Sequence, residues 1–119
     1  MPNGNRIQSD TVIFITRQGM GCAENELQVK LLRTYLTLLE EGEALPAAIC
    51  FYTDGVKLVV EGSPVLDRLQ KLEDRGVRLI CCSTCLDYFG LRDKLKVGIL
   101  GGMADIVEAQ TRATKVVTI

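Results

Sequence analysis

The chain has 119 residues, the size of one ordinary domain and enough to bury a core without cross-links. Apolar residues make up 47% and charged residues 24%, which excludes a disordered chain. The 14 basic and 15 acidic residues are interspersed, which excludes the basic face that nucleic acid requires, and no apolar run approaches the ~20 residues of a membrane span. The polar residues 1–10 lack the apolar core of a signal peptide and predict a flexible segment, followed by one cytoplasmic domain over 11–119.

The first half of the chain predicts a strand, a glycine loop, a helix and a second strand. Thr11–Thr16 is a β-branched and aromatic run, typical of a strand buried on both faces, and Ala47–Tyr52 is similar. Between them, Asn25–Glu41 has helical periodicity, and Gly42 is a suitable end. The apolar residues of this helix predict a wide buried face: Leu27, Leu31, Leu32, Tyr35, Leu36, Leu38 and Leu39.

The second half continues the alternation of helices and strands. One predicted helix begins at Ser63-Pro64, with Ser63 as the cap, and ends at Gly76. A second covers Ser83–Tyr88 and is capped by Ser83 or Thr84. A third covers Gly102–Arg112, with Ile106 and Val107 pointing inward. Predicted strands cover Val77–Cys81, Val97–Leu100 and Lys115–Ile119. This order predicts a three-layer α/β/α fold with a mostly parallel five-stranded sheet.

In such sheets the functional crevice lies beyond the carboxyl ends of the strands, which selects three loops. Two of them carry candidate substrate-binding residues, namely Gly19, Gly21, Asp54, Gly55 and Lys57. The third, C-S-T-C, carries the candidate catalytic residues Cys82 and Cys85. All three loops should lie at the same edge of the sheet.

Two alternatives for these loops are disfavoured. Gly19 and Gly21 resemble part of a dinucleotide fingerprint, but the third glycine is replaced by Glu24, whose carboxylate would repel pyrophosphate. A zinc site needs four ligands, whereas this chain has one C-x-x-C and no histidine. We therefore expect no metal and no cofactor.

Thiol chemistry is the remaining function class. Five cysteines, an odd number, in a chain that needs no cross-links predict reduced thiols, and Cys50 and Cys81 lie inside predicted strands, where buried thiols are inert. The absence of histidine excludes a Cys-His pair, so the pKa of Cys82 or Cys85 would have to be lowered by a helix N-terminus or by cations such as Lys57, Arg92, Lys94 or Lys96. A dithiol-disulfide redox role for Cys82 and Cys85 remains an alternative.

Several runs together resemble a known family. The runs are C-S-T-C-L-D-Y-F-G-L, F-Y-T-D-G-V-K-L-V-V-E-G-S-P-V-L, K-V-G-I-L-G-G-M-A-D-I-V-E and K-V-V-T-I. They are similar to the DsrE-like domain of YedF-type sulfurtransferase-like proteins, from about Thr11 to the end. Two differences stand out: the ten residues before Thr11 hold no Cys-Pro-x-Pro motif of the TusA-like domain that typically precedes this one, and Ser83 replaces the glycine of the family's C-G-T-C.

The resemblance implies the DsrE/DsrF-like fold, a homo-oligomer (trimer or hexamer) and sulfur transfer. In DsrE and TusD relatives a cysteine after the third strand carries sulfur as a persulfide, and the corresponding residue here is Cys85, with Cys82 as a resolving thiol. Partners would be sulfur donor and acceptor proteins such as TusA-like carriers, and YedF relatives add an association with selenium metabolism. DsrE-type assemblies also contain subunits whose own cysteine is idle, so a non-catalytic role is a further alternative.

Overall fold

The computed structural model describes residues 7–119, and it contains a parallel five-stranded sheet. The strands are β2 (Thr11–Ile15), β4 (Ala48–Phe51), β5 (Arg78–Cys82), β6 (Ile99–Gly101) and β7 (Lys115–Thr118). They lie in the order β6-β5-β4-β2-β7, with every neighbouring pair parallel. The carboxyl ends of the three central strands therefore meet at one edge of the sheet, as predicted.

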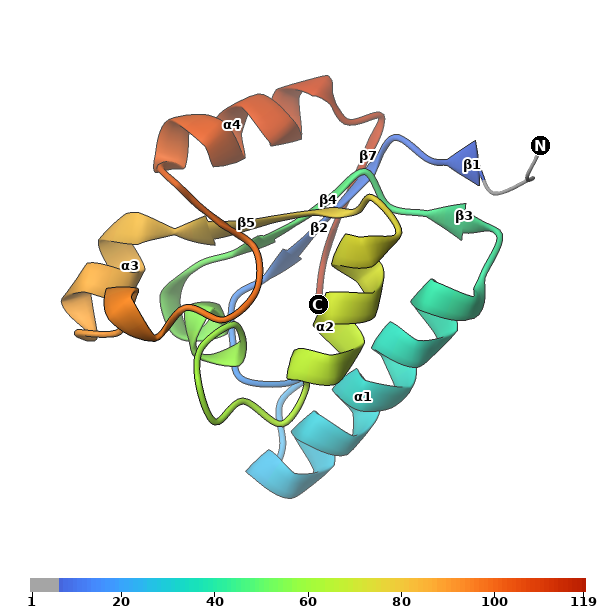
Figure 1. Cartoon of the computed structure of the whole chain (residues 1–119). Coiled ribbons are helices and arrows are strands. Elements are labelled where there is room, and N and C mark those ends of the chain that lie inside the picture. The colour runs from blue at the N-terminus through green and yellow to red at the C-terminus, as the bar shows by residue number, and fades with distance from the viewer. Residues whose placement is uncertain (1–6) are drawn as a thin grey trace.

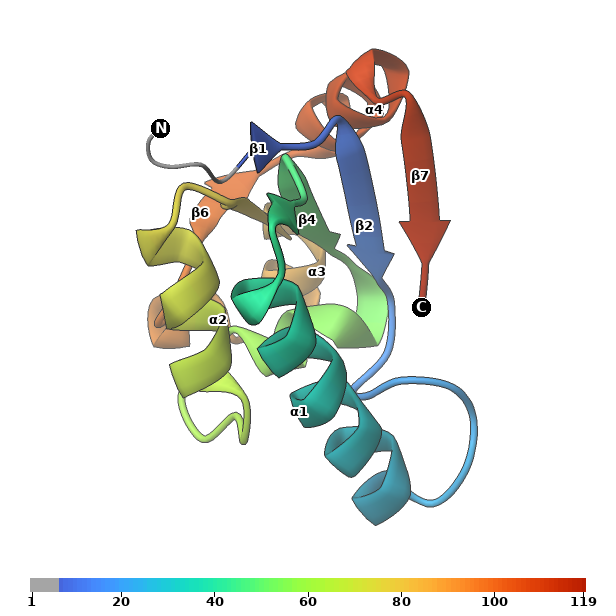
Figure 2. The same cartoon turned by 90° about the vertical axis from the view of Figure 1, so that its right-hand side faces the viewer.

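Helices cover both faces of the sheet (Figures 1 and 2). The helices α1 (Asn25–Glu41) and α2 (Leu66–Asp74) pack together on one face, and α4 (Met103–Arg112) covers the other. The short helix α3 (Ser83–Tyr88) follows β5 at the carboxyl edge, together with the 3₁₀ segments η1 (Thr53–Leu58) and η2 (Arg92–Lys94). The predicted three-layer α/β/α architecture is confirmed. Within the described residues no helix is both long and apolar enough to cross a bilayer.

The core explains why the sequence adopts this sheet. In β4 every side chain is buried, and in β2 only Thr11 is partly exposed, as parallel strands covered on both faces require. The helices add Leu32 and Leu36 from α1, Leu69 and Leu72 from α2, and Ile106 from α4, so that the helix side of each core layer is aliphatic. Burial of these strands fixes the position of the loops at their carboxyl ends.

The predicted buried face of α1 is too wide. Leu32 and Leu36 are fully buried, but Leu38 is 63% exposed, and Leu27 and Leu31 are also exposed. A helix that packs on one sheet face and one neighbouring helix buries a stripe of limited width, and seven apolar positions exceed it. For the same reason Val107 of α4 is 48% exposed while its neighbour Ile106 is buried, so the prediction that both point inward is wrong for Val107.

Helix starts also differ from the prediction. The Ser63 hydroxyl accepts the N–H of Val65 in a turn, and α2 begins only at Leu66, so Ser63 and Pro64 precede the helix. The residue at the N-cap of α3 is Cys82, without a side-chain cap bond, because β5 extends one residue further than predicted.

A short additional pairing precedes the sheet. β1 (Ile7–Gln8) pairs in parallel with β3 (Ala44–Leu45). The sequence predicts a flexible segment over residues 1–10. Residues 1–6 lie outside the described part of the chain, whereas residues 7–8 form this strand.

Candidate functional site

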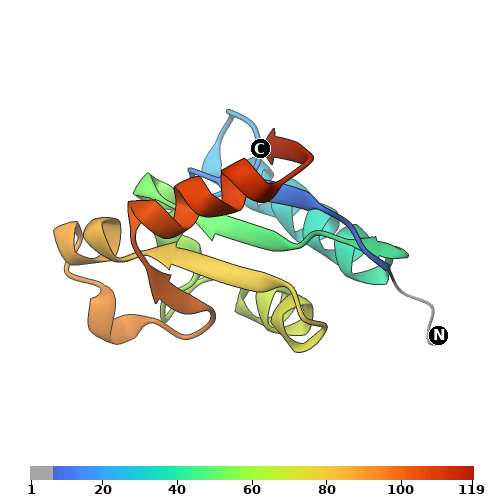
Figure 3. The same cartoon turned by 90° about the horizontal axis from the view of Figure 1, so that it is seen from above.

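The side chain of Cys85 occupies the carboxyl edge of the sheet, between α3 and η1. β5 runs directly into α3, whose third residue is Cys85, and η1 follows the neighbouring strand β4. Figure 3 shows α3 at the end of the sheet opposite to β3. Because β4 and β5 are neighbours, Thr53 after β4 lies next to the thiol of Cys85 after β5, although the two residues are 32 positions apart in sequence.

The main chain of Thr53 supplies the hydrogen-bond donor to this thiol. The Thr53 N–H donates to Cys85 Sγ over 3.1 Å. Thr53 has φ of 50°, in the left-handed region that a β-branched residue rarely adopts. Its hydroxyl oxygen lies 2.8 Å from the carbonyl oxygen of Thr16 and 2.7 Å from that of Tyr52, and its single proton is shared between these two acceptors, which holds the residue in this conformation. A strained backbone position thus directs an N–H at the sulfur.

The resting thiol is nevertheless not activated. Partial burial is the largest influence and raises the pKa of the Cys85 thiol; the Thr53 N–H opposes this effect, and a hydrogen bond with Cys82 adds to it. The expectation of a lowered pKa is therefore wrong for Cys85. Two of the cations considered are engaged elsewhere: Lys57 pairs with Asp54 at 3.0 Å, and Arg92 pairs with Asp87 at 2.6 Å.

The thiol opens into a small, largely apolar hollow of about 330 Å³, the thiol cavity. Its lining residues come from η1, from α3 and from the residue directly after α3, and are Thr53, Asp54, Thr84, Cys85, Tyr88 and Phe89. Tyr88 is 85% exposed, and its ring meets that of Phe89 edge-on with 5.3 Å between centroids. The Tyr88 and Phe89 rings thus border the thiol cavity, and a reactant can reach the half-buried sulfur of Cys85 from solvent.

The other four cysteines differ in their burial and their neighbours. Cys82 ends β5, is only 2% exposed and hydrogen-bonds with Cys85. Cys50 and Cys81 are buried in neighbouring strands, as predicted, and burial raises their pKa values to about 11 and about 12. Cys22 is exposed in the loop between β2 and α1, and all five thiols are free.

Of the predicted substrate-binding residues, three lie on η1. Asp54 lines the thiol cavity, and Lys57 lies beside it, with its ammonium 4.3 Å from the centroid of the Phe89 ring. Gly55 has a packing role, because a Cβ atom there would lie 2.0 Å from the carbonyl oxygen of Ile15. Only glycine lets η1 approach the end of β2 this closely.

The remaining two predicted residues lie in the loop between β2 and α1. Gly19 is buried, and a Cβ there would lie 2.4 Å from Cβ of Gln28 on α1. Gly21 is exposed with φ of 77°, and its carbonyl accepts a hydrogen bond from Arg17. Local packing therefore explains the glycine at position 19, and the positive φ explains the glycine at position 21. Neither residue lines the thiol cavity.

Within residues 7–119 no three acidic, cysteine or histidine side chains gather closely enough to hold a metal ion. Cys82 and Cys85 are neighbours, but no further ligand of this kind joins them there. The chemistry that the described site offers is that of a thiol.

Sequence reasoning missed Thr53, Tyr88 and Phe89. The turn residues Asp54 and Gly55 indicated the loop, but no side-chain pattern reveals that a threonine will adopt positive φ and present its N–H. Tyr88 and Phe89 lie in the run L-D-Y-F-G directly after Cys85. Their spacing of three and four residues from Cys85, about one helical turn, was the available signal that they lie beside the thiol.

One comparison with known proteins identifies the family of this chain. The model of the DsrE/DsrF-like family matches residues 9–119. The chain belongs to the DsrE/DsrF-like family. No curated protein matches it. Membership of the DsrE/DsrF-like family indicates a function related to sulfur relay, and the finer assignment depends on the site described above.

Solved structures share the DsrE/DsrF-like fold of this chain. The ychN protein from E. coli is 22% identical with a TM-score of 0.71, covering 95% of this chain and 100% of its own. MTH1491 from Methanobacterium thermoautotrophicum, a protein of unknown function, is 24% identical with a TM-score of 0.67, covering 92% and 97%. BT1422 from Bacteroides thetaiotaomicron, a conserved protein of unknown function, is 18% identical with a TM-score of 0.61, covering 92% and 95%. At these identities the likeness concerns the fold.

Proposed function

We propose that this protein is a sulfur carrier that holds sulfane sulfur as a persulfide on Cys85. The Cys85 thiolate attacks the outer sulfur of a donor persulfide, R–S–SH. The donor S–S bond breaks, R–S⁻ leaves, and Cys85–S–SH forms without net oxidation or reduction. An acceptor thiolate then attacks the outer sulfur of Cys85–S–SH and regenerates the Cys85 thiolate.

The observation that carries the proposal is the hydrogen bond of the Thr53 N–H to a reachable Cys85 sulfur in an apolar cavity. The hydrogen-bond donor is the main-chain N–H of Thr53, which remains in place when the Cys85 sulfur becomes anionic. It therefore stabilises the Cys85 thiolate that leaves when the outer sulfur passes to the acceptor. The raised pKa of Cys85 keeps the resting thiol protonated, which limits unwanted alkylation and oxidation between cycles.

The test is mass-resolved loading. The protein is incubated with a persulfide donor, and intact mass is measured for wild type, Cys85→Ser, Cys82→Ser and the matched control Cys22→Ser, which removes an exposed thiol outside the cavity. We expect wild type and Cys22→Ser to gain the mass of one sulfur atom and Cys85→Ser to gain none. Equal loading of Cys85→Ser would refute the assignment.

A second candidate function is dithiol-disulfide redox chemistry, favoured by the hydrogen bond between Cys82 and Cys85. In a combined cycle the Cys82 thiolate attacks the inner sulfur of Cys85–S–SH, HS⁻ leaves, and a Cys82–Cys85 disulfide forms, which an external dithiol must then reduce. A redox titration that gives a two-electron couple lost in Cys82→Ser, in a protein that never loads sulfur, would favour this function over the carrier.

We propose a homo-oligomer, a trimer or hexamer, as the working form. Exposed apolar side chains from the edge strand β6 and the following helix support this, namely Ile99, Leu100, Met103 and Val107. Unpaired strand edges and apolar patches of this kind are usually covered in solution. Light scattering should give a multiple of the chain mass, and Leu100→Arg should reduce it; a monomeric wild type would contradict the proposal.

We further infer a cytoplasmic setting and exchange with donor and acceptor proteins such as TusA-like carriers. Five free thiols support a reducing compartment. Selenium is an alternative cargo of the same thiol, and loading with a selenium donor, read by mass, separates it from sulfur. Failure to transfer the loaded sulfur to a TusA-like protein would contradict the partner assignment while leaving the loading intact.

A further inference from the structure

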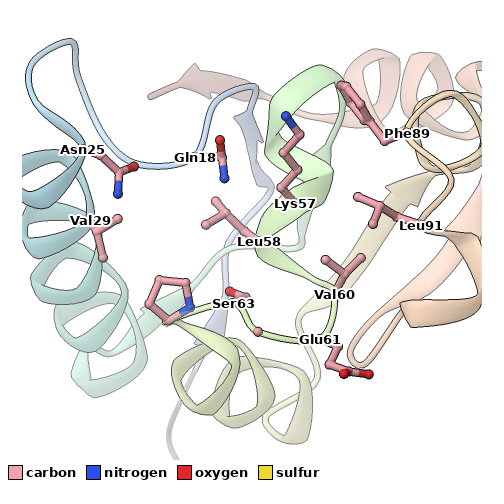
Figure 4. Close-up of a pocket in the computed structure, with 12 residues that line it drawn as sticks. Gln18, Asn25, Val29, Lys57, Leu58, Val60, Glu61, Ser63, Phe89 and Leu91 are labelled. Carbon is pink, nitrogen blue, oxygen red and sulfur yellow. The ribbon is translucent and has the colours of Figure 1, made fainter.

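A second hollow of about 440 Å³ lies beside the thiol cavity; we call it the rim cleft (Figure 4). Five segments of the carboxyl edge form it: the loop after β2, the start of α1, η1, the turn before α2 and the coil after α3. Its floor includes the buried Leu58 and Val60, and its polar rim includes Gln18, Asn25 and Lys57. Its volume lies in the range of small-molecule sites, about 300–1,000 Å³.

The rim cleft and the thiol cavity share a wall. Phe89 lines both hollows. Lys57, on the rim of the cleft, lies over the Phe89 ring and pairs with Asp54, which lines the thiol cavity. A molecule bound in the cleft would therefore end next to the space in front of Cys85.

The rim carries unused hydrogen-bonding groups. Within the described residues, the side-chain amides of Gln18 and Asn25 make no hydrogen bond, and both residues are exposed and line the cleft (Figure 4). The Ser63 hydroxyl accepts the Val65 N–H, which leaves its own proton free to donate. The side-chain amides on the rim can both donate and accept hydrogen bonds, and the floor of the cleft is aliphatic. This combination is complementary to a ligand whose peptide bonds are joined by short aliphatic segments.

The charged side chains of the rim cleft restrict the chemical class of the ligand further. Lys57 is a cation on the rim near Phe89, and Glu61 is an exposed carboxylate that lines the cleft at the opposite end of the view in Figure 4. A ligand with a carboxylate and an ammonium group complements both, and Lys57 has donors to spare beyond its bond to Asp54. Free amino acids and short peptides have this combination.

We propose that the rim cleft binds a low-molecular-weight peptide thiol, of the glutathione class, as the persulfide donor to Cys85. This rests on the proposed function. The peptide persulfide G–S–SH, held by the rim amides, presents its outer sulfur past Phe89; the Cys85 thiolate attacks it, Cys85–S–SH forms, and G–S⁻ leaves. One S–S bond breaks and one forms, so the step needs no oxidant or reductant.

Binding is tested with S-methylglutathione, which cannot transfer sulfur. Titration of the isotope-labelled full chain should shift amide resonances of the cleft segments. Gln18→Ala and Asn25→Ala each remove an amide and should raise Kd by roughly 2- to 10-fold, the equivalent of one hydrogen bond. Gln110→Ala is the matched control, because this glutamine is exposed on α4 across the sheet; thermal melting confirms that the variants are folded.

Loading assays separate this inference from the proposed function. Inorganic polysulfide and glutathione persulfide are compared as donors to Cys85, with the same mass readout. If polysulfide loads Cys85 but S-methylglutathione causes no shifts at millimolar concentration, or binds Gln18→Ala and Asn25→Ala as it binds Gln110→Ala, the rim cleft inference alone is overturned. If neither donor loads Cys85, the proposed function is overturned, and with it the donor role of the bound peptide.

Discussion

Replacement of Gly55 by alanine tests whether the packing of η1 against β2 sets the geometry of the thiol. The new Cβ would lie 2.0 Å from the carbonyl oxygen and 2.8 Å from the carbonyl carbon of Ile15. Both contacts are to the backbone of the last residue of β2, which the sheet holds in place, so η1 has to move by roughly 1 Å or more to restore normal separations. Overpacking of this kind costs about 3 kcal/mol of unfolding free energy.

The same movement reaches the sulfur. Thr53 lies two residues before Gly55, and its N–H is 3.1 Å from Cys85 Sγ, so a displacement of that size breaks the hydrogen bond. Loss of this donor raises the pKa of Cys85 further, because the N–H favours the thiolate. Gly55→Ala should therefore lose stability and thiol reactivity together.

The assays are denaturant unfolding and the rate of Cys85 alkylation at fixed pH. Gly102→Ala is the matched control, since a Cβ there meets nothing within 4 Å and its φ of −103° suits any residue. It removes only the glycine at the N-cap of α4 and should cost less than about 1 kcal/mol. If Gly55→Ala is as stable as Gly102→Ala and alkylates at the wild-type rate, the packing argument is refuted.

Three further predictions concern the thiol, the strained turn and the helix face. In a Cys22→Ser background, the rate of Cys85 alkylation should rise about tenfold per pH unit through neutral pH and level off only above the usual range of thiols, because only the thiolate reacts and its pKa is raised; a plateau near pH 7 would contradict the raised pKa. Thr53→Val keeps the positive φ but loses the hydroxyl, and should cost about 1–2 kcal/mol in denaturant unfolding, whereas Thr53→Gly relieves the strain and should cost less; the reverse order would exclude strain at this turn. Leu36→Ala should cost about 2–5 kcal/mol and Leu38→Ala less than about 0.5 kcal/mol, because Leu36 is fully buried and Leu38 is 63% exposed; equal losses would contradict the observed face of α1.

The sequence predicted the fold well because periodicity and alternation are local signals. The run Thr11–Thr16 differs from the observed β2 by one residue, and α1 has the predicted bounds. Burial was harder to predict, since Leu38 is as apolar as Leu36 and only the neighbours of a helix decide which of them is covered. Val107 shows the same limit.

The site was predictable in position but not in electrostatics. Parallel strand order alone brings the loop of Asp54 to the loop of Cys85, and the structure contains that juxtaposition. The pKa of Cys85 depends on burial, a main-chain N–H and a second thiol, none of which a residue pattern reveals. The rim cleft also escaped prediction, because its lining comes from five separate segments.

The donor to Cys85 is a main-chain group, and this affects how such sites can diverge. A main-chain N–H does not titrate and is kept by every residue except proline, so the identity of residue 53 is free to drift wherever the left-handed turn is maintained. Sequences that share this chemistry need not share Thr53; asparagine or glycine would hold the turn with less strain. Searches for related thiol sites should therefore compare backbone conformation at this turn before comparing side chains.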